Sequence, residues 1–327
     1  MFDVITIGAA TRDVFLLSKQ FQAKRDKSSP TDLNLALPLG SKINVDDIIF
    51  ETGGGATNAA VTFARQKLRA SCIVRIGEDP GGKVIVESLQ NEGVNTDLII
   101  KDKENYTGYS IILTTNEGER TILVYRGASA HFTSDFVPKN KLEAKWLFIS
   151  SLGGNMELLN SLVVWADGHK IDTAVIPGKA ELEKGARALA PIFAKADVVI
   201  MNREEAADIT GIDFDQKEQV VHKMCLLARG VGVITDGVGG ATACDENYFY
   251  HIGTHGNPAV ERTGAGDAFA SGFLAGLIKS GSIEEALELA ADNASNVVNY
   301  FGAKKGIIHS GEHPFKEKLR VTKKKIT

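Results

Sequence analysis

Short apolar runs alternate with amphipathic stretches along most of the chain. Residues 4–7 form a strand-like run, and from about residue 56 strand-like and helix-like segments follow one another. The strand-like segments are 72–76, 146–150, 173–176, 197–201 and 232–235, and the helix-like segments are 56–67, 82–92, 156–166, 183–194, 204–210, 217–228, 268–279 and 283–300. Fully apolar strands that alternate with helices predict an α/β fold, with a mainly parallel central sheet covered by helices on both faces.

Two segments, 14–50 and 101–126, interrupt this alternation with β-type sequence. The second one turns at Asn116-Glu117-Gly118, and this turn predicts a hairpin in which residues 109–115 pair with 121–126. We expect the two segments to form a small β-sheet lid over an α/β core. The core comprises residues 1–13, 51–100 and 127–327. Because exposed sheet edges tend to be covered, the lid is also the candidate surface for a homodimer.

Composition and charge exclude several classes of protein. The 327 residues include 33 glycines and carry a formal net charge of -4, whereas nucleic-acid binding usually brings a basic excess. No apolar stretch is long enough to span a bilayer, no secretory leader is evident, and the lysine-rich tail fits a solvated terminus. Cys72, Cys225 and Cys244 are too scattered for a disulfide framework, so we interpret them as buried thiols of a cytoplasmic protein.

The informative glycines lie at junctions between strands and helices, where α/β folds bind anions. The run Gly53-Gly54-Gly55-Ala56-Thr57-Asn58 precedes a helix and is either a backbone that a substrate approaches or a hinge to the lid. The run Thr235-Asp236-Gly237-Val238-Gly239-Gly240 ends a strand and fits either a nucleotide loop or a tight hairpin.

The sharpest signal is Arg262-Thr263-Gly264-Ala265-Gly266-Asp267, which leads directly into a helix. The backbone amides of Gly264, Ala265 and Gly266 are then unsatisfied donors beside the positive end of the helix dipole. Such an oxyanion cradle next to Asp267 fits phosphoryl transfer. In that reaction the amides stabilise developing charge, and the aspartate takes the proton of an attacking hydroxyl.

In this order, the motifs resemble the ribokinase-like (PfkB) family of carbohydrate and nucleoside kinases, over residues 4 to about 308. Gly264-Ala265-Gly266-Asp267 is similar to the family's GAGD signature, and Asn202-Arg203-Glu204-Glu205 is similar to its N-x-x-E motif. Thr235, Gly237 and Gly240 match its T-x-G-x-x-G nucleotide loop. The segment from Gly53 to Asn58 resembles its GG-x-x-x-N stretch, and Asp13 resembles its substrate-binding aspartate.

The resemblance implies a ribokinase-like fold and an ATP-dependent carbohydrate kinase. The enzyme would transfer the γ-phosphoryl group to a hydroxymethyl group of a sugar or sugar derivative, as ribokinase, fructokinase and ketodeoxygluconate kinase do. The implied catalytic residues are the base Asp267 and an anion hole of Gly264, Ala265 and Gly266. The implied ligand contacts are Asp13, Gly53, Gly54, Asn58 and Arg126 for the acceptor, Asn202, Thr235, Gly237, Gly240 and Asn293 for ATP, and Glu205 for Mg²⁺ through water.

The sequence leaves the acceptor and one cofactor open. Nucleoside kinases acting on adenosine, cytidine or inosine share every motif, and a catalytically inactive sugar- or nucleotide-binding protein on the same fold is a further alternative. Arg126 fits either an acidic or phosphorylated sugar or a side chain lying across the lid. Glu261 stands where family members commonly carry the aspartate of a potassium site, so dependence on a monovalent cation stays open.

Overall fold

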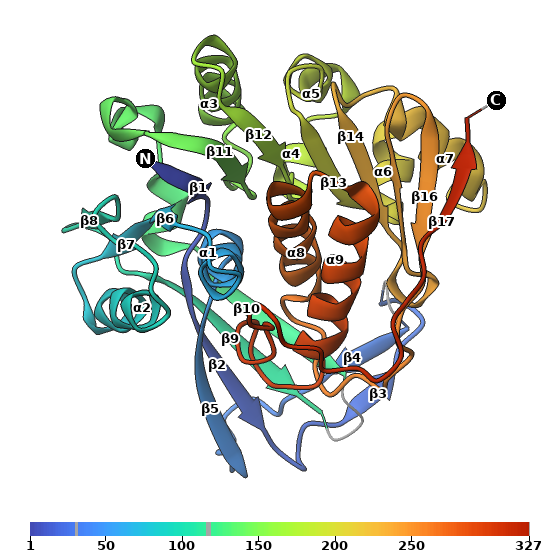
Figure 1. The fold of residues 1–327 in the computed structure, drawn as a ribbon. Helices are drawn as coiled ribbons and strands as arrows, with labels where there is room; N and C mark the ends of the chain where they lie inside the picture. Colours follow the sequence, from blue (N-terminus) through green and yellow to red (C-terminus); the bar gives the residue numbers. More distant parts are fainter. Residues whose placement is uncertain (30–31, 116–118, 327) are drawn as a thin grey trace.

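The computed structural model describes residues 1–29, 32–115 and 119–326, and its centre is a nine-stranded sheet (Figure 1). In spatial order the strands are β17 (Thr322–Lys325), β16 (Tyr248–Ile252), β15 (Ala241–Cys244), β14 (Val231–Thr235), β13 (Val198–Asn202), β12 (Asp172–Val175), β11 (Ala144–Ile149), β1 (Phe2–Ile7) and β6 (Ala70–Ile73). Strands from β14 to β6 pair in parallel, and the other three add an antiparallel edge. The predicted mainly parallel sheet is confirmed.

Helices cover both faces of this sheet because alternate residues of each strand point to opposite sides. On β13, Val199 and Met201 belong to one core cluster, and Val198 and Ile200 belong to the other. The first cluster packs under α3 (Met156–Gly168), α5 (Ala186–Phe193), α6 (Arg203–Thr210) and α7 (Lys217–Cys225), and the second packs under α1 (Gly55–Arg65), α8 (Ala265–Ser280) and α9 (Ile283–Val297). Among the described helices, none combines the length and the apolar character that a membrane crossing needs.

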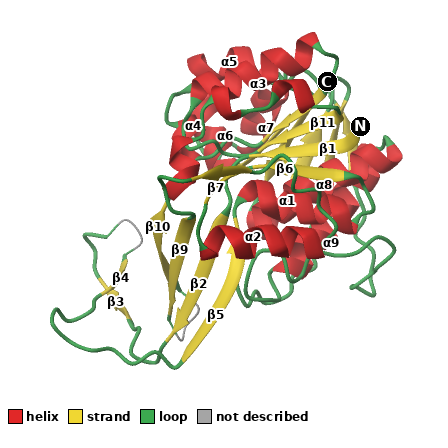
Figure 2. Ribbon diagram, turned by 90° about the vertical axis from the view of Figure 1, so that its left-hand side faces the viewer, coloured by secondary structure: helices red, strands yellow, loops and turns green. Residues whose placement is uncertain are grey.

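A second sheet, of four strands, projects from the core (Figure 2). Its order is β10 (Arg120–Tyr125), β9 (Gly108–Thr114), β2 (Thr11–Leu17) and β5 (Asp47–Gly53). The predicted hairpin is confirmed, because Tyr109 pairs with Tyr125 and Thr114 pairs with Arg120, while its turn at 116–118 lies outside the described residues. We call this sheet the lid.

Some smaller elements differ from the sequence-based predictions. The predicted strand 72–76 is divided, because the chain leaves the main sheet and β7 (Arg75–Gly77) pairs instead with β8 (Ile100–Asp102). The C-terminal tail, expected as a solvated terminus, includes β17, which pairs with β16 while its lysines stay exposed. The remaining α-helices and strands of the described residues are α2 (Pro80–Asn91), α4 (Lys179–Leu182), and the pair β3 (Ala23–Arg25) and β4 (Leu33–Leu35).

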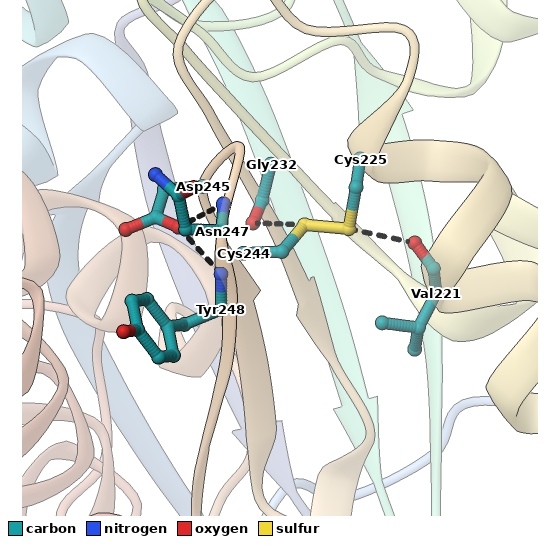
Figure 3. The surroundings of a disulfide bond; sticks show 7 residues. All are labelled: Val221, Cys225, Gly232, Cys244, Asp245, Asn247 and Tyr248. Atoms are coloured by element: carbon teal, nitrogen blue, oxygen red, sulfur yellow. Dashed lines mark hydrogen bonds between the residues drawn. A yellow bond between two sulfur atoms is a disulfide. The ribbon is translucent and has the colours of Figure 1, made fainter. Parts of the chain in front are cut away.

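The interpretation of all three cysteines as buried thiols is wrong for two of them. Cys225 at the end of α7 and Cys244 at the end of β15 form a disulfide, with their Cα atoms 5.8 Å apart (Figure 3). The two cysteines are 19 positions apart in the sequence, and the packing of α7 over β14, the strand that pairs with β15, brings them together. Cys72 alone is a free, buried thiol, as predicted.

Candidate active site

The predicted site residues lie where the lid joins the core and where the parallel strands end. Asp13 is on the lid strand β2, and its carboxylate is buried against the neighbouring strand β5. Asp13 Oδ1 accepts a hydrogen bond from Thr11 Oγ1 at 2.9 Å, and a Cβ atom on Gly53 would collide with Asp13 Oδ2. Burial raises the pKa of the Asp13 carboxyl. The bare backbone of Gly53 is therefore what allows this carboxylate to sit there.

The triple glycine continues from the lid into the N-terminus of α1. Gly54 has a φ of 99°, and a Cβ atom on it would collide with the carbonyl oxygen of Ala9, so only glycine fits this position. Gly55 starts α1 beside the catalytic candidate, since a Cβ atom on it would lie 3.2 Å from Asp267 Oδ1. The chain thus presents backbone, with no side chain, between lid and core.

Asn58 on α1 makes direct contact with Asp267 on α8. Asn58 Nδ2 donates a hydrogen bond to Asp267 Oδ2 at 2.8 Å. Burial raises the pKa of the Asp267 carboxyl, and the hydrogen bond from Asn58 opposes that rise. The other amide atom, Asn58 Oδ1, is buried without a hydrogen-bond partner in the structure. An unpartnered buried acceptor is costly, so this atom is expected to receive a hydrogen bond from a ligand.

The N-terminus of α8 has the open geometry of an anion site. Among the residues that the structure describes, no side chain caps it. Its N-cap residue Gly264 has a φ of 83°, where a Cβ atom would collide with Ala303. Gly266 is exposed, and a Cβ atom on it would meet nothing within 4 Å. The Ala265 amide donates to the Arg262 carbonyl at 3.3 Å, whereas the amides of Gly264 and Gly266 have no acceptor within the described residues. Those two amides are therefore available to an oxyanion next to Asp267, as the helix N-terminus favours.

The predicted ATP contacts come from two neighbouring strands. Asn202 and Thr235 are register partners at the ends of β13 and β14. After Thr235, the segment from Asp236 to Gly240 makes a tight antiparallel turn into β15, in which the amide of Asp236 donates to the Gly240 carbonyl at 2.8 Å. The structure therefore supports the hairpin interpretation of this run. Gly237 follows two residues after Thr235, the register partner of Asn202.

Asn202 and Glu205 cap the N-terminus of α6. Asn202 Oδ1 accepts from the Glu205 amide, and Glu205 Oε2 accepts from the Asn202 amide, both at 2.8 Å. Burial raises the pKa of Glu205, and its Oε1 atom has no hydrogen bond within the described chain. No cluster of three metal-ligating side chains occurs among the described residues. The residues present fit Mg²⁺ as one carboxylate joined by phosphate oxygens and water, which is the usual arrangement for this ion.

Of the two remaining predicted ligand contacts, Asn293 is turned away from the site and Arg126 stays a candidate. Asn293 on α9 is fully buried; its amide donates to the Ala268 carbonyl at 2.8 Å, and its Oδ1 accepts from the Ile308 amide at 3.0 Å. Asn293 therefore holds the core together, and we withdraw it as an ATP contact. Arg126 is exposed at the return of the lid to the core, and a Cβ atom on Gly153 would lie 3.7 Å from Arg126 Nη1.

Sequence patterns did not reveal a buried lysine close to Asp13, the predicted contact of the acceptor. Lys304 follows α9, and its Nζ atom donates to the carbonyl oxygen and the hydroxyl of Thr52 at 2.9 and 2.8 Å. Burial lowers the pKa of Lys304 to about 8, while the negative charge of Asp13 is the largest influence in the opposite direction. The charge of Asp267 acts in the same direction, so one buried ammonium group partly compensates the negative charges of both Asp13 and Asp267. No local motif marks this residue.

Comparison with known proteins agrees with these features. The model of the "pfkB family carbohydrate kinase" family matches residues 3–309. A ribokinase of Staphylococcus aureus is 26% identical over 311 residues, which cover 93% of this chain and 96% of the relative. A fructokinase of Vibrio alginolyticus is 26% identical over 247 residues, covering 68% and 75% of the two chains. The structure of Arabidopsis thaliana ribokinase with ribose and ATP has the same fold, with a TM-score of 0.77, 20% identity, and coverage of 94% and 96%.

Proposed function

The chain belongs to the pfkB family of carbohydrate kinases, and from this premise we propose that it transfers the γ-phosphoryl group of ATP to a hydroxymethyl group of a sugar or sugar derivative. The observation that carries the proposal is the contact between Asn58 and Asp267 at 2.8 Å. Asn58 Oδ1 has no donor among the described residues, and the neighbouring Asp267 carboxylate is the proposed proton acceptor. A polyhydroxylated acceptor supplies one hydroxyl to each, so it satisfies both atoms at once.

In the proposed step Asp267 takes the proton of the acceptor hydroxyl while that oxygen attacks the γ-phosphorus. The bond from the γ-phosphorus to the oxygen that bridges it to the β-phosphorus breaks, and ADP leaves with the electron pair. The amides of Gly264, Ala265 and Gly266 stabilise the charge that develops on the transferred group. When bound, Mg²⁺ neutralises phosphate charge, and Glu205 would hold it through water.

The acceptor class is proposed from Arg126 and from the relatives. Relatives named ribokinase and fructokinase support a sugar. Arg126 is exposed near Gly153 and has no ion-pair partner among the described residues, which favours an acceptor with a carboxylate or phosphate, as in ketodeoxygluconate kinases. If this is correct, Arg126→Gln raises KM for acidic sugars and leaves KM for neutral sugars unchanged; an equal effect on both would assign Arg126 to the lid surface.

The experiment that tests the function is a coupled assay of ADP release with Mg²⁺ and ATP. The acceptor panel contains neutral sugars, sugar acids, sugar phosphates and the nucleosides adenosine, cytidine and inosine. Turnover on a sugar that is lost in Asp267→Asn supports the proposal, and preference for a nucleoside replaces it with the nucleoside-kinase alternative. No turnover on any acceptor, with ATP still bound, would favour the inactive binding protein.

We propose that turnover does not require potassium. Glu261 is buried, and its Oε1 atom already lies 3.0 Å from Arg120 Nη1, so a guanidinium compensates its charge. Replacing potassium with choline in the assay buffer is then expected to leave kcat unchanged. A strong activation by potassium over choline would contradict this.

A homodimer through the lid is supported by the apolar residues that the lid leaves exposed. Strand alternation and register place five of them on one face, which are Ile48, Phe50, Ile111, Leu123 and Tyr125. A continuous apolar face of this kind is typical of an interaction surface. Sedimentation analysis of Phe50→Asp, which places a charge in the middle of that face, is expected to show a monomer where the unchanged chain is a dimer.

We propose a cytoplasmic location because the phosphoryl donor is ATP. The Cys225–Cys244 disulfide is the observation against it, since stable disulfides are rare in the cytosol outside hyperthermophiles. Rapid alkylation of thiols in the producing cells, followed by cell fractionation and mass spectrometry, tests the location and the disulfide together. Recovery of the chain in the cytoplasmic fraction with Cys225 and Cys244 still oxidised would support both the location and the bond.

A further inference from the structure

A groove lies on the face of the main sheet opposite α8 and α9, beside α7. Helix α7 packs over β14, and β16 and β17 extend the sheet beyond it, so their residues on this face form an open floor. The groove has a volume of about 650 Å³, within the usual range for small-molecule sites. Thr242, Phe249 and His251 form the floor, and Lys217, His222 and Lys324 are among the residues around it.

The charge of this groove is opposite in sign to that of the chain. Four lysines line it, Lys217, Lys223, Lys324 and Lys325, against the single acid Glu218, although the net charge of the chain is -4. Lys217 is paired with Asp236, but in the part of the chain that the structure describes no carboxylate forms an ion pair with the other three. The pairing of β17 with β16 thus brings two lysines of the C-terminal tail, Lys324 and Lys325, to the groove.

The floor of the groove is aromatic. The His222 and Phe249 rings have centroids 6.2 Å apart, and His251 Nδ1 lies 3.1 Å from Thr242 Oγ1. Burial lowers the pKa of His251, and the charge of Lys217 adds to that effect. The imidazole of His251 is therefore uncharged near pH 7. Flat rings surrounded by ammonium groups suit a ligand that has both an aromatic ring system and negative charge, because the rings stack and the lysines pair with phosphate.

We propose that this groove is a second nucleotide site, in which the base stacks on Phe249 with the tilted His222 ring at its edge, while the phosphates lie among Lys217, Lys223 and Lys324. The site is separate from the GAGD end of α8, because α7 and α8 cover opposite faces of the sheet. The disulfide between Cys225 and Cys244 ties the helical wall of the groove to the adjacent strand, which holds its shape (Figure 3).

One ion pair connects the groove to the loop proposed for ATP. Lys217 Nζ lies 2.8 Å from Asp236 Oδ2, and Asp236 stands between Thr235 and Gly237. Arg203 is the other cation on Asp236, with Nε 3.1 Å from Oδ1. A phosphate bound in the groove competes with Asp236 for Lys217, which loosens the loop. Occupation of the groove is therefore expected to raise KM for ATP roughly fivefold or more; this consequence, unlike the binding itself, rests on the proposed function.

The test is equilibrium dialysis of the full chain with ADP. Two molecules bound per chain are expected, and the groove variant Lys223→Glu with Lys324→Glu is expected to bind one of them at least roughly tenfold more weakly. The matched control is Lys316→Glu with Arg320→Glu, which makes the same charge change in the tail outside the groove. Identical ADP binding by the unchanged chain and the groove variant would overturn the site.

Two further measurements separate the possible failures. Tripolyphosphate has the charge without the base, so binding of tripolyphosphate in the groove as tight as that of ADP would overturn the nucleotide assignment. If the chain lacked kinase activity but still lost one bound ADP in the groove variant, the proposed function would fail while the groove site stood. If turnover were normal and only one ADP bound in every variant, the groove site would fail while the proposed function stood.

Discussion

Arg120 of the lid forms an ion pair with Glu261 of the core, with Nη1 and Oε1 3.0 Å apart. The same carboxylate accepts hydrogen bonds from the amide and the hydroxyl of Thr263 at 2.9 and 2.8 Å. Thr263 directly precedes Gly264, the N-cap of α8. One buried carboxylate therefore connects the lid to the segment that precedes the proposed anion hole.

Replacing Arg120 with alanine leaves Glu261 buried, at 5% exposure, without its cation. Breaking a buried pair on one side costs about 3 kcal/mol of stability, and here it also frees the Thr263 segment. We expect Arg120→Ala to lower the melting temperature and kcat together. Adding Glu261→Gln removes the unpaired charge and should restore part of the stability; a double variant as unstable as the sum of the two single changes would show that the residues do not interact.

Asp267→Asn removes the proposed base while keeping the shape of the side chain. We expect kcat to fall by roughly 10²–10⁴, the usual contribution of general-base catalysis, with the melting temperature little changed. Asp13→Asn is the matched control, since it alters the other site carboxylate. It should raise KM for the acceptor more than it lowers kcat. Near-normal turnover by Asp267→Asn would remove this residue from the role of base.

The pH dependence of turnover should depend on Asn58. The carboxylate of Asp267 is the active form, so activity falls as the pH drops through its pKa, and the Asn58 amide holds that pKa down against burial. In Asn58→Ala the pKa rises further, and the acid limb of kcat against pH, at saturating acceptor, moves to higher pH. An acid limb at the same pH in both proteins would mean that Asp267 does not titrate in it.

Lys304 predicts a pH dependence of stability. Its pKa is about 8 in the folded chain and near 10.5 when unfolded, so between these values the unfolded chain binds the proton more tightly. The destabilisation from burying this charge is complete below pH 8 and declines as the pH rises towards 10.5. Denaturant unfolding should thus show the stability of the unchanged chain rising, relative to Lys304→Met, over this window. A pH-independent difference would contradict the low pKa.

The disulfide predicts a response to reductant. A loop closed by residues 19 apart is worth about 3 kcal/mol in the chain-entropy account. Dithiothreitol should lower the unfolding free energy of the unchanged chain and of Cys72→Ala by that amount. Cys225→Ser with Cys244→Ser should show the lowered value from the start, with no response to reductant.

Most of the fold followed from local patterns. Strands that are apolar on both faces and helices with one apolar stripe are visible in short windows, so the parallel sheet and its two helical layers were predictable. The lid hairpin was predictable for the same reason, because residues 109–115 and 121–126 are rich in β-branched and aromatic residues and flank a turn at Asn116-Glu117-Gly118. The pairing of β7 with β8 instead of the main sheet was not, since it depends on packing between distant segments.

The site was predictable only as far as it consists of motifs. Each glycine-rich junction was visible, and the structure brings Asn58 of one motif onto Asp267 of another. Lys304 contacts Thr52 across 252 residues of sequence, and the Arg120–Glu261 pair also joins distant segments, so neither leaves a local signal. Asn293 shows the reverse error: its residue type suits ATP, but its position on α9 turns it into the core.

The glycine strip from Gly53 to Gly55 offers an acceptor only backbone. A floor without side chains holds many polyols equally well, so discrimination among them has to come from the groups that face it. Those come from the lid and its return to the core, with Asp13 and Arg126 among them. If the proposed function holds, the residues that catalyse the reaction and the residues that select the acceptor belong to different parts of the molecule. Exchanging lids between related kinases should then transfer substrate preference and leave the phosphoryl-transfer residues unchanged.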